Sequence, residues 1–136
     1  MKTLLEFYEW VNGRKIDVLG IGISNLPLIK ALANNGAKVK AHDRRGDMGE
    51  TGRELLGLGV ELVLGEKYLS GIDGEMVFKT PGLRFDVPEL LEAKEKGAKI
   101  TSEMELFFEV CPAHIFAVTG SDGKTTTTTL IYKMLK

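Results

Sequence analysis

Apolar residues follow two periodicities along the chain, and their alternation predicts an α/β fold. Short apolar runs typical of buried strands lie at residues 15–22, 37–43, 60–64, 75–79, 98–101 and 114–118. Helical spacing predicts helices at residues 3–12, 24–35, 51–56, 86–97, 102–110 and 124–136. Strands separated by helices need crossover connections, which run parallel strands into one sheet. We therefore expect a Rossmann-like, mostly parallel sheet with flanking helices.

Two of these helices have recognisable start signals. Ser24 or Asn25 can cap the helix that follows the first strand. Asp86 precedes Glu89 by three residues, which predicts a capping box, and Pro88 is tolerated in the first turn.

The first strand runs into a glycine turn with the sequence Gly20-x-Gly22. Asp43 follows about twenty residues later, at the end of the second strand, as in dinucleotide-binding folds. Asn25, however, stands where that fingerprint has its third glycine. Three interpretations stay open at this point: a tight turn that binds nothing, a nicotinamide or flavin site, and a nucleotide bound by other means.

A second glycine turn follows the apolar run 114–118. Its spacing is Gly120-x-x-Gly123-Lys124-Thr125, shorter than the usual phosphate loop, because Val118 stands at the position of the first glycine. Gly120 and Gly123 allow backbone amides to bend around a phosphate, Lys124 adds a cation for β/γ-phosphates, and Thr125 offers a hydroxyl to Mg²⁺. The alternative is a strand, turn and helix whose Gly-Lys-Thr is accidental.

The composition limits the classes of partner that the chain is expected to bind. With 18 basic and 19 acidic residues the net charge is −1, so neither nucleic acid nor an anionic membrane surface is indicated. No apolar run is long enough to span a bilayer, and the start of the chain is not a signal peptide. The single cysteine, Cys111, permits no internal disulfide, and one Cys with two distant His offers no metal cluster.

Five spaced motifs together resemble the Mur ligases, and the resemblance covers essentially all 136 residues. They are Gly20-Ile21-Gly22-Ile23-Ser24, Asp43-Arg44-Arg45, Lys79-Thr80-Pro81-Gly82, Thr101-Ser102-Glu103-Met104-Glu105, and the stretch from Val118 to Thr127. The shortened phosphate loop is part of this resemblance. It implies a cytoplasmic enzyme of peptidoglycan synthesis that uses ATP and Mg²⁺. The reaction would join D-glutamate to UDP-N-acetylmuramoyl-L-alanine through an acyl phosphate.

The resemblance also implies two groups of site residues. The uridine diphosphate end of the substrate would contact Ile23, Ser24, Asp43, Arg44, Arg45, Thr80, Pro81 and Gly82. ATP would be held by Gly120, Ser121, Asp122, Gly123, Lys124, Thr125 and Thr126, with Lys124 and Thr125 in catalytic roles and Thr125 on Mg²⁺. Residues 1–110 would form the substrate domain, and residues 111–136 the first strand, loop and helix of a truncated ATP-binding domain.

Members of this family continue for several hundred residues beyond the phosphate loop. We therefore expect the 136-residue chain to be an inactive fragment of the ligase. Two alternatives remain: another Mur ligase, such as one that adds L-alanine, and a non-catalytic nucleotide-binding module.

Overall fold

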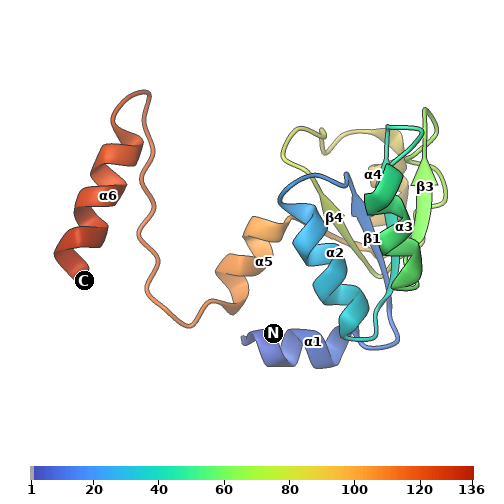
Figure 1. Cartoon of the computed structure of the whole chain (residues 1–136), viewed down its shortest axis with the longest axis horizontal. Helices are drawn as coiled ribbons and strands as arrows, with labels where there is room; N and C mark the ends of the chain where they lie inside the picture. The colour runs from blue at the N-terminus through green and yellow to red at the C-terminus, as the bar shows by residue number, and fades with distance from the viewer. Residues whose placement is uncertain (1) are drawn as a thin grey trace.

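The computed structural model describes residues 2–136 and alternates strands with helices, as predicted (Figure 1). The elements are α1 (Leu4–Val11), β1 (Lys15–Leu19), α2 (Asn25–Asn34), β2 (Lys38–Asp43), α3 (Gly49–Gly57), β3 (Glu61–Leu64), β4 (Met76–Lys79), α4 (Pro88–Glu95), β5 (Lys99–Thr101), α5 (Glu103–Val110) and α6 (Lys124–Leu135). All six predicted helices form, and so do five of the six predicted strands.

The five strands form one parallel sheet in the order β3-β2-β1-β4-β5. β1 lies at its centre, where Val18 pairs with Ala41 of β2 and with Phe78 of β4. Strand order reverses at β1, because the chain moves outward to β2 and β3 and then returns to β4. In open α/β sheets, ligands bind beyond the carboxyl ends of the strands at such a reversal.

Each face of the sheet carries its own apolar core. Helices α1, α2, α3 and α5 pack on one face, where Phe7, Ile29 and Leu55 are fully buried against the strands. Leu90 of α4 packs on the other face, with Leu19 and Val77. A sheet covered on both sides explains why four of the five residues of β1 and all four residues of β4 are buried.

The predicted helix starts are confirmed in one case and wrong in another. Ser102 accepts a hydrogen bond from the Glu105 N–H and so caps α5. The capping box predicted at Asp86 is wrong, because Val87 is the N-cap residue of α4 and Asp86 instead pairs with Arg84 at 2.6 Å. Ser24 occupies the N-cap position of α2 but makes no side-chain cap bond.

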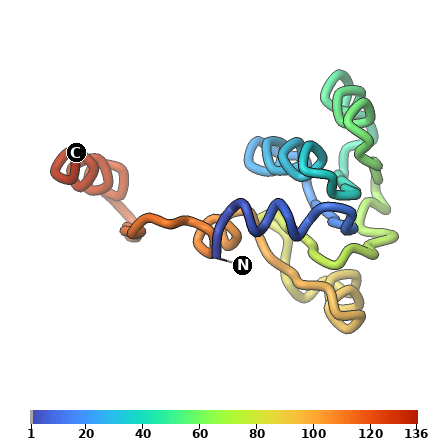
Figure 2. Tube along the Cα trace, turned by 90° about the horizontal axis from the view of Figure 1, so that it is seen from below, coloured from blue at the N-terminus to red at the C-terminus, as the bar shows by residue number. Residues whose placement is uncertain are grey.

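The strand predicted at residues 114–118 does not form. This segment is extended but unpaired, and it leads away from the sheet to α6, which stands apart in both views (Figures 1 and 2). Phe116 is 65% exposed, and α6 buries none of its residues. A strand of a parallel sheet needs neighbouring strands to satisfy its backbone groups, and within residues 2–136 none is available beside this segment. The proposed boundary near residue 110 stays a prediction.

Within the described part of the chain, none of the helices combines the length and the apolar character needed to cross a membrane.

Candidate functional site

Three loops meet beyond the carboxyl ends of the three central strands. The first glycine turn follows β1, residues 43–45 follow β2, and residues 80–82 follow β4. Because β2, β1 and β4 are neighbours in the sheet, these loops come together although they are far apart in the sequence. All eight residues predicted to contact the uridine diphosphate lie in or beside these loops.

Gly20 lets two of these loops approach each other. Its φ of +98° lies in the region that favours glycine, and its N–H donates to the His42 carbonyl at 2.6 Å. A Cβ on Gly20 would lie 2.5 Å from Thr80 Cγ2, which is closer than real contacts allow. The loop after β1 therefore packs directly against Thr80 of the loop after β4.

Asp43 fastens the loop after β2 to the first glycine turn. One carboxylate oxygen accepts from the Ile21 N–H at 2.8 Å and from Arg45 Nη2 at 2.9 Å. The other accepts from the Arg45 N–H and from Arg45 Nε, both at 2.9 Å. The Arg45 side-chain bonds are the main cause that lowers the pKa of Asp43 from 3.8 to about 2. Asp43 is thus a positioning residue, with both oxygens engaged inside the protein.

Arg45 is held at the turn but keeps a solvent-facing surface. Its Nη2 donates to the Ile21 carbonyl at 2.7 Å in addition to its bonds to Asp43. Even so, 59% of the Arg45 side chain is exposed. A guanidinium fixed in orientation and still accessible is suited to bind a phosphate in a defined geometry.

The amino end of α2 faces the same region. Asn25, which is buried, donates from Nδ2 to the Gly20 carbonyl at 2.9 Å and so ties the turn to the helix. Ser24 is exposed and leaves the first turn of α2 without a side-chain acceptor, and no acidic residue lies in that turn. Within this turn the Leu26 N–H donates to the Gly22 carbonyl at 2.9 Å and Pro27 has no N–H, so it is chiefly the positive end of the helix dipole that favours an anion here.

Gly22 and Gly82 have no structural reason to be glycine within the chain. Neither has a positive φ, and a Cβ added to either would meet nothing within 4 Å. Gly57, at the exposed end of α3, shares this property. The property therefore indicates a ligand site only for a glycine that also lies at the carboxyl edge of the sheet. At the carboxyl edge of a parallel sheet, a missing Cβ allows a ligand to approach the backbone closely.

The remaining predicted residues lie on the surface of the same site. Ile23 is 97% exposed, and Arg44 and Pro81 are also exposed. Pro81 and Gly82 border a hollow of about 330 Å³, which the residues of the first glycine turn do not line. The site is therefore an open shelf rather than an enclosed cavity.

The second glycine turn is not part of this shelf. Gly123 has a φ of +75° and is the N-cap residue of α6, so the predicted turn and helix form without the strand before them. All residues from Gly120 to Thr126 are exposed. Thr128 and Thr129 do not cap the helix start, because their hydroxyls donate to the carbonyls of Lys124 and Thr125. The two predicted nucleotide sites are thus separate in space (Figure 1).

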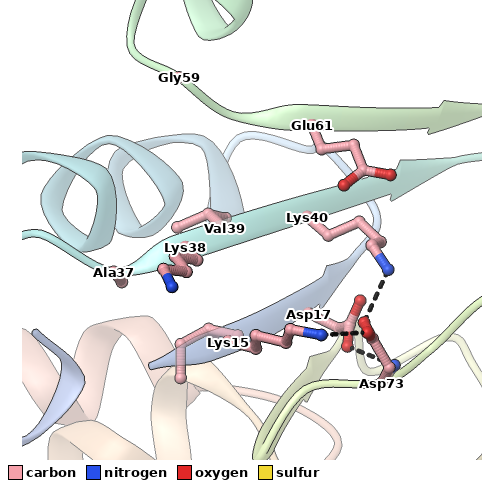
Figure 3. Close-up of a pocket in the computed structure, with 10 residues that line it drawn as sticks. Lys15, Asp17, Ala37, Lys38, Val39, Lys40, Gly59, Glu61 and Asp73 are labelled. Carbon is pink, nitrogen blue, oxygen red and sulfur yellow. Dashed lines mark hydrogen bonds and ion pairs between the residues drawn. The ribbon is translucent and has the colours of Figure 1, made fainter. Parts of the chain in front are cut away.

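The opposite edge of the sheet also has a hollow, of about 300 Å³, at the amino ends of β1, β2 and β3 (Figure 3). Lys15 and Lys40 both pair with Asp73 there, each at 2.7 Å. Behind them Asp17 pairs with the buried His42 at 2.7 Å. These charges neutralise one another, and their contacts hold the segment after β3 against the sheet.

Sequence reasoning missed two residues of the carboxyl-edge site. Asn25 was considered as a helix cap and as a replacement for a glycine, but not as a residue that ties the turn to the helix. A polar residue at the start of an apolar helix face was the available signal. Lys79 is the other: it stood in the third motif but was given no role, and it is 4% exposed and directly precedes Thr80. Its signal was a cation at the end of an apolar strand. In residues 2–136 there is no group of three His, Cys, Asp or Glu side chains placed to hold a metal ion.

An open parallel sheet with a glycine turn at its reversal point is the architecture of many nucleotide-binding α/β domains. No family model matches the chain. Among solved structures, the UDP-N-acetylmuramate-alanine ligase MurC from Thermotoga maritima superposes with a TM-score of 0.60 and 30% identity, over 90% of this chain and 29% of that one. The chain is thus similar in fold and sequence to part of a Mur ligase.

The sequence comparison is more specific. UDP-N-acetylmuramoylalanine–D-glutamate ligase from Clostridium botulinum is 55% identical over 96% of this chain. The same ligase from Acetivibrio thermocellus is 52% identical over the whole chain. The chain spans only 29% and 30% of the length of these two relatives.

Proposed function

We propose that residues 1–110 bind the uridine diphosphate end of UDP-N-acetylmuramoyl-L-alanine, as the substrate domain of a ligase that adds D-glutamate to it. The observation that carries this proposal is the shelf on which Asp43 fixes Arg45 beside the first glycine turn. The 55% identity to a UDP-N-acetylmuramoylalanine–D-glutamate ligase supports the same substrate, whereas identity to the alanine-adding MurC is 30%.

Each part of the shelf has a role in this proposal. Ser24 and the backbone at Ile23 would donate to the diphosphate, with the amino end of α2 behind them. Arg45 would supply the fixed cation, and Arg44 would lie beside the uracil and phosphates. Asp43 would act by holding Arg45 and the first glycine turn in place. Thr80, Pro81 and Gly82 would close over the nucleotide from the β4 side.

The second glycine turn is proposed to hold ATP. The helix α6 starts at Lys124 after a left-handed Gly123, and no side chain caps its first N–H groups. This arrangement fits a phosphate loop: residues 120–126 would cradle the phosphates, and the Lys124 ammonium would neutralise their charge. Thr125 would be one Mg²⁺ ligand. ATP would convert a poor acyl donor, the substrate carboxylate, into an acyl phosphate.

We expect the 136 residues alone not to complete this reaction. They span less than a third of the relatives' length, and the described residues offer no metal-ligand cluster. In the proposal the whole ligase acts in the cytoplasm, in peptidoglycan synthesis, with D-glutamate as its second substrate.

Calorimetric titration of the chain with UDP, UDP-N-acetylmuramoyl-L-alanine, ATP and NAD tests the proposal. We expect the two uridine compounds to bind and NAD not to bind. Arg45→Gln should weaken uridine nucleotide binding about tenfold or more, as expected for loss of a charge-assisted contact, while the exposed Arg53→Gln on α3 should not. Binding of NAD alone, or equal effects of the two substitutions, would contradict it.

The structure gives a reason to disfavour a dinucleotide cofactor. In that class an acidic residue at the end of the second strand accepts hydrogen bonds from the ribose. Asp43 has the right position, but each of its oxygens already accepts two hydrogen bonds from Ile21 and Arg45.

A further inference from the structure

Lys79 is a buried cation without a carboxylate partner in residues 2–136. It is the last residue of β4 and is 4% exposed. Its ammonium donates to two backbone carbonyls, that of Thr80 at 3.1 Å and that of Leu83 at 2.8 Å. The ammonium also lies 4.1 Å from the centre of the Phe85 ring. A buried ammonium is costly, so these contacts must together compensate its loss of water.

These contacts all lie in the loop after β4. The Thr80 carbonyl accepts a second hydrogen bond, from the Leu83 N–H at 3.2 Å, which closes a four-residue turn. Pro81 and Gly82 occupy the two central positions of this turn, and Pro81 fixes its own φ there. The Lys79 ammonium therefore binds both the first and the last carbonyl of the turn and holds them close to the end of β4.

The consequence is an outward-facing turn tip. With the carbonyls of Thr80 and Leu83 directed at Lys79, Pro81 and Gly82 are left exposed at the site. Thr80 itself is seated against Gly20, so the position of the turn is coupled to that of the first glycine turn. Disordering the turn would thus disturb both sides of the shelf.

We propose that Lys79 is a positioning residue for nucleotide binding: its ammonium holds residues 80–83 in the shape that closes over the diphosphate. This inference rests on the proposed function of the shelf. It assigns to Lys79 an indirect role, through the turn, rather than contact with the ligand.

Three variants test it. Lys79→Met keeps the unbranched apolar stem and removes the donors, and Lys79→Arg keeps a cation that can donate. Phe85→Leu leaves the strand intact and removes only the ring. The matched control is Lys38→Met, which makes the same chemical change at the exposed start of β2.

Two readouts are needed. UDP affinity by calorimetry should fall about tenfold or more in Lys79→Met, because two charge-assisted bonds are lost. Lys79→Arg should recover most of this loss, Phe85→Leu should lose about two- to fivefold, and Lys38→Met should match wild type. In parallel, the heteronuclear NOE of the Gly82 and Leu83 amides should fall in Lys79→Met, while the β4 amides keep wild-type values.

The outcomes separate this inference from the proposed function. If the wild type does not bind UDP, the proposed function fails, and the NOE at residues 82–83 still tests the effect of Lys79 on the turn. If the wild type binds and a folded Lys79→Met binds equally well, the inference is overturned. It is also overturned if binding is lost while the turn amides stay ordered, since Lys79 would then act directly by its charge.

Discussion

The hydrogen bonds between Asp43 and Arg45 predict a specific dependence of stability on pH. Asp43→Asn keeps the shape of the side chain but removes the carboxylate charge, whose hydrogen bonds from Arg45 are the main cause that lowers the pKa of Asp43 to about 2. Since one pKa unit is worth about 1.4 kcal/mol, a pKa lowered from 3.8 to about 2 corresponds to roughly 2 kcal/mol at neutral pH. Because the Arg45 side chain is 59% exposed, solvent screening makes this an upper value.

The sign follows from proton linkage. A carboxylate whose pKa is lower in the folded state stabilises the fold above its unfolded pKa, near 4, and this contribution is lost as pH falls through about 2. The difference in unfolding free energy between wild type and Asp43→Asn should therefore be largest at pH 7. It should shrink to about half by pH 3, because between the two pKa values Asp43 is mostly protonated in the unfolded state and still mostly ionised in the folded state.

Urea unfolding followed by the fluorescence of Trp10, the single tryptophan, measures this difference at pH 7, 5, 4 and 3. Asp73→Asn is a matched control, because the pKa of Asp73 is also lowered to about 2, chiefly by its bond to Lys15, yet its side chain is 49% exposed. Asp73→Asn should cost less than about 1 kcal/mol. A difference for Asp43→Asn that stays constant from pH 7 to pH 3 would refute the assigned role of its charge.

Two further predictions concern the glycine turn and the end of the chain. Gly20→Ala should lower the unfolding free energy by at least about 2 kcal/mol, because it combines an unfavourable φ with a clash at Thr80. Gly22→Ala should change stability by no more than about 1 kcal/mol, in the stabilising direction, yet weaken UDP binding. Equal losses of stability for the two variants in urea unfolding would contradict the difference in space around Gly20 and Gly22. Deleting residues 113–136 should leave the Trp10 unfolding transition unchanged, since α6 buries none of its residues, and a clear drop in its urea midpoint would reveal a stabilising contact.

Local patterns in the sequence determined the order and type of the elements. An apolar period of 2 or of 3.6 reflects which side chains face a core, and this can be read from neighbouring residues alone. The order of the motifs also indicated the Mur ligase relationship, and it indicated that Gly20, Asp43 and Thr80 lie at strand ends. Because parallel strands end at one edge of a sheet, those three positions could be expected to meet.

The tertiary structure alone decided which polar groups become partners. Asp86 has the spacing of a capping residue but pairs with Arg84, because a side-chain bond depends on the path of the loop and not on spacing. Asp43 could have faced a ligand, yet its oxygens are taken by Ile21 and Arg45. Lys79 is buried only because residues 80–85 fold back over it.

The same reason explains the failed strand at residues 114–118. Apolar character is a local property, but a strand exists only when another strand accepts its hydrogen bonds, and that partner lies elsewhere in a chain. The sequence by itself therefore determined which segments form helices and where five of the six predicted strands lie. The three-dimensional fold decided which backbone and charged groups meet across the sheet, since those contacts join residues that are distant in sequence.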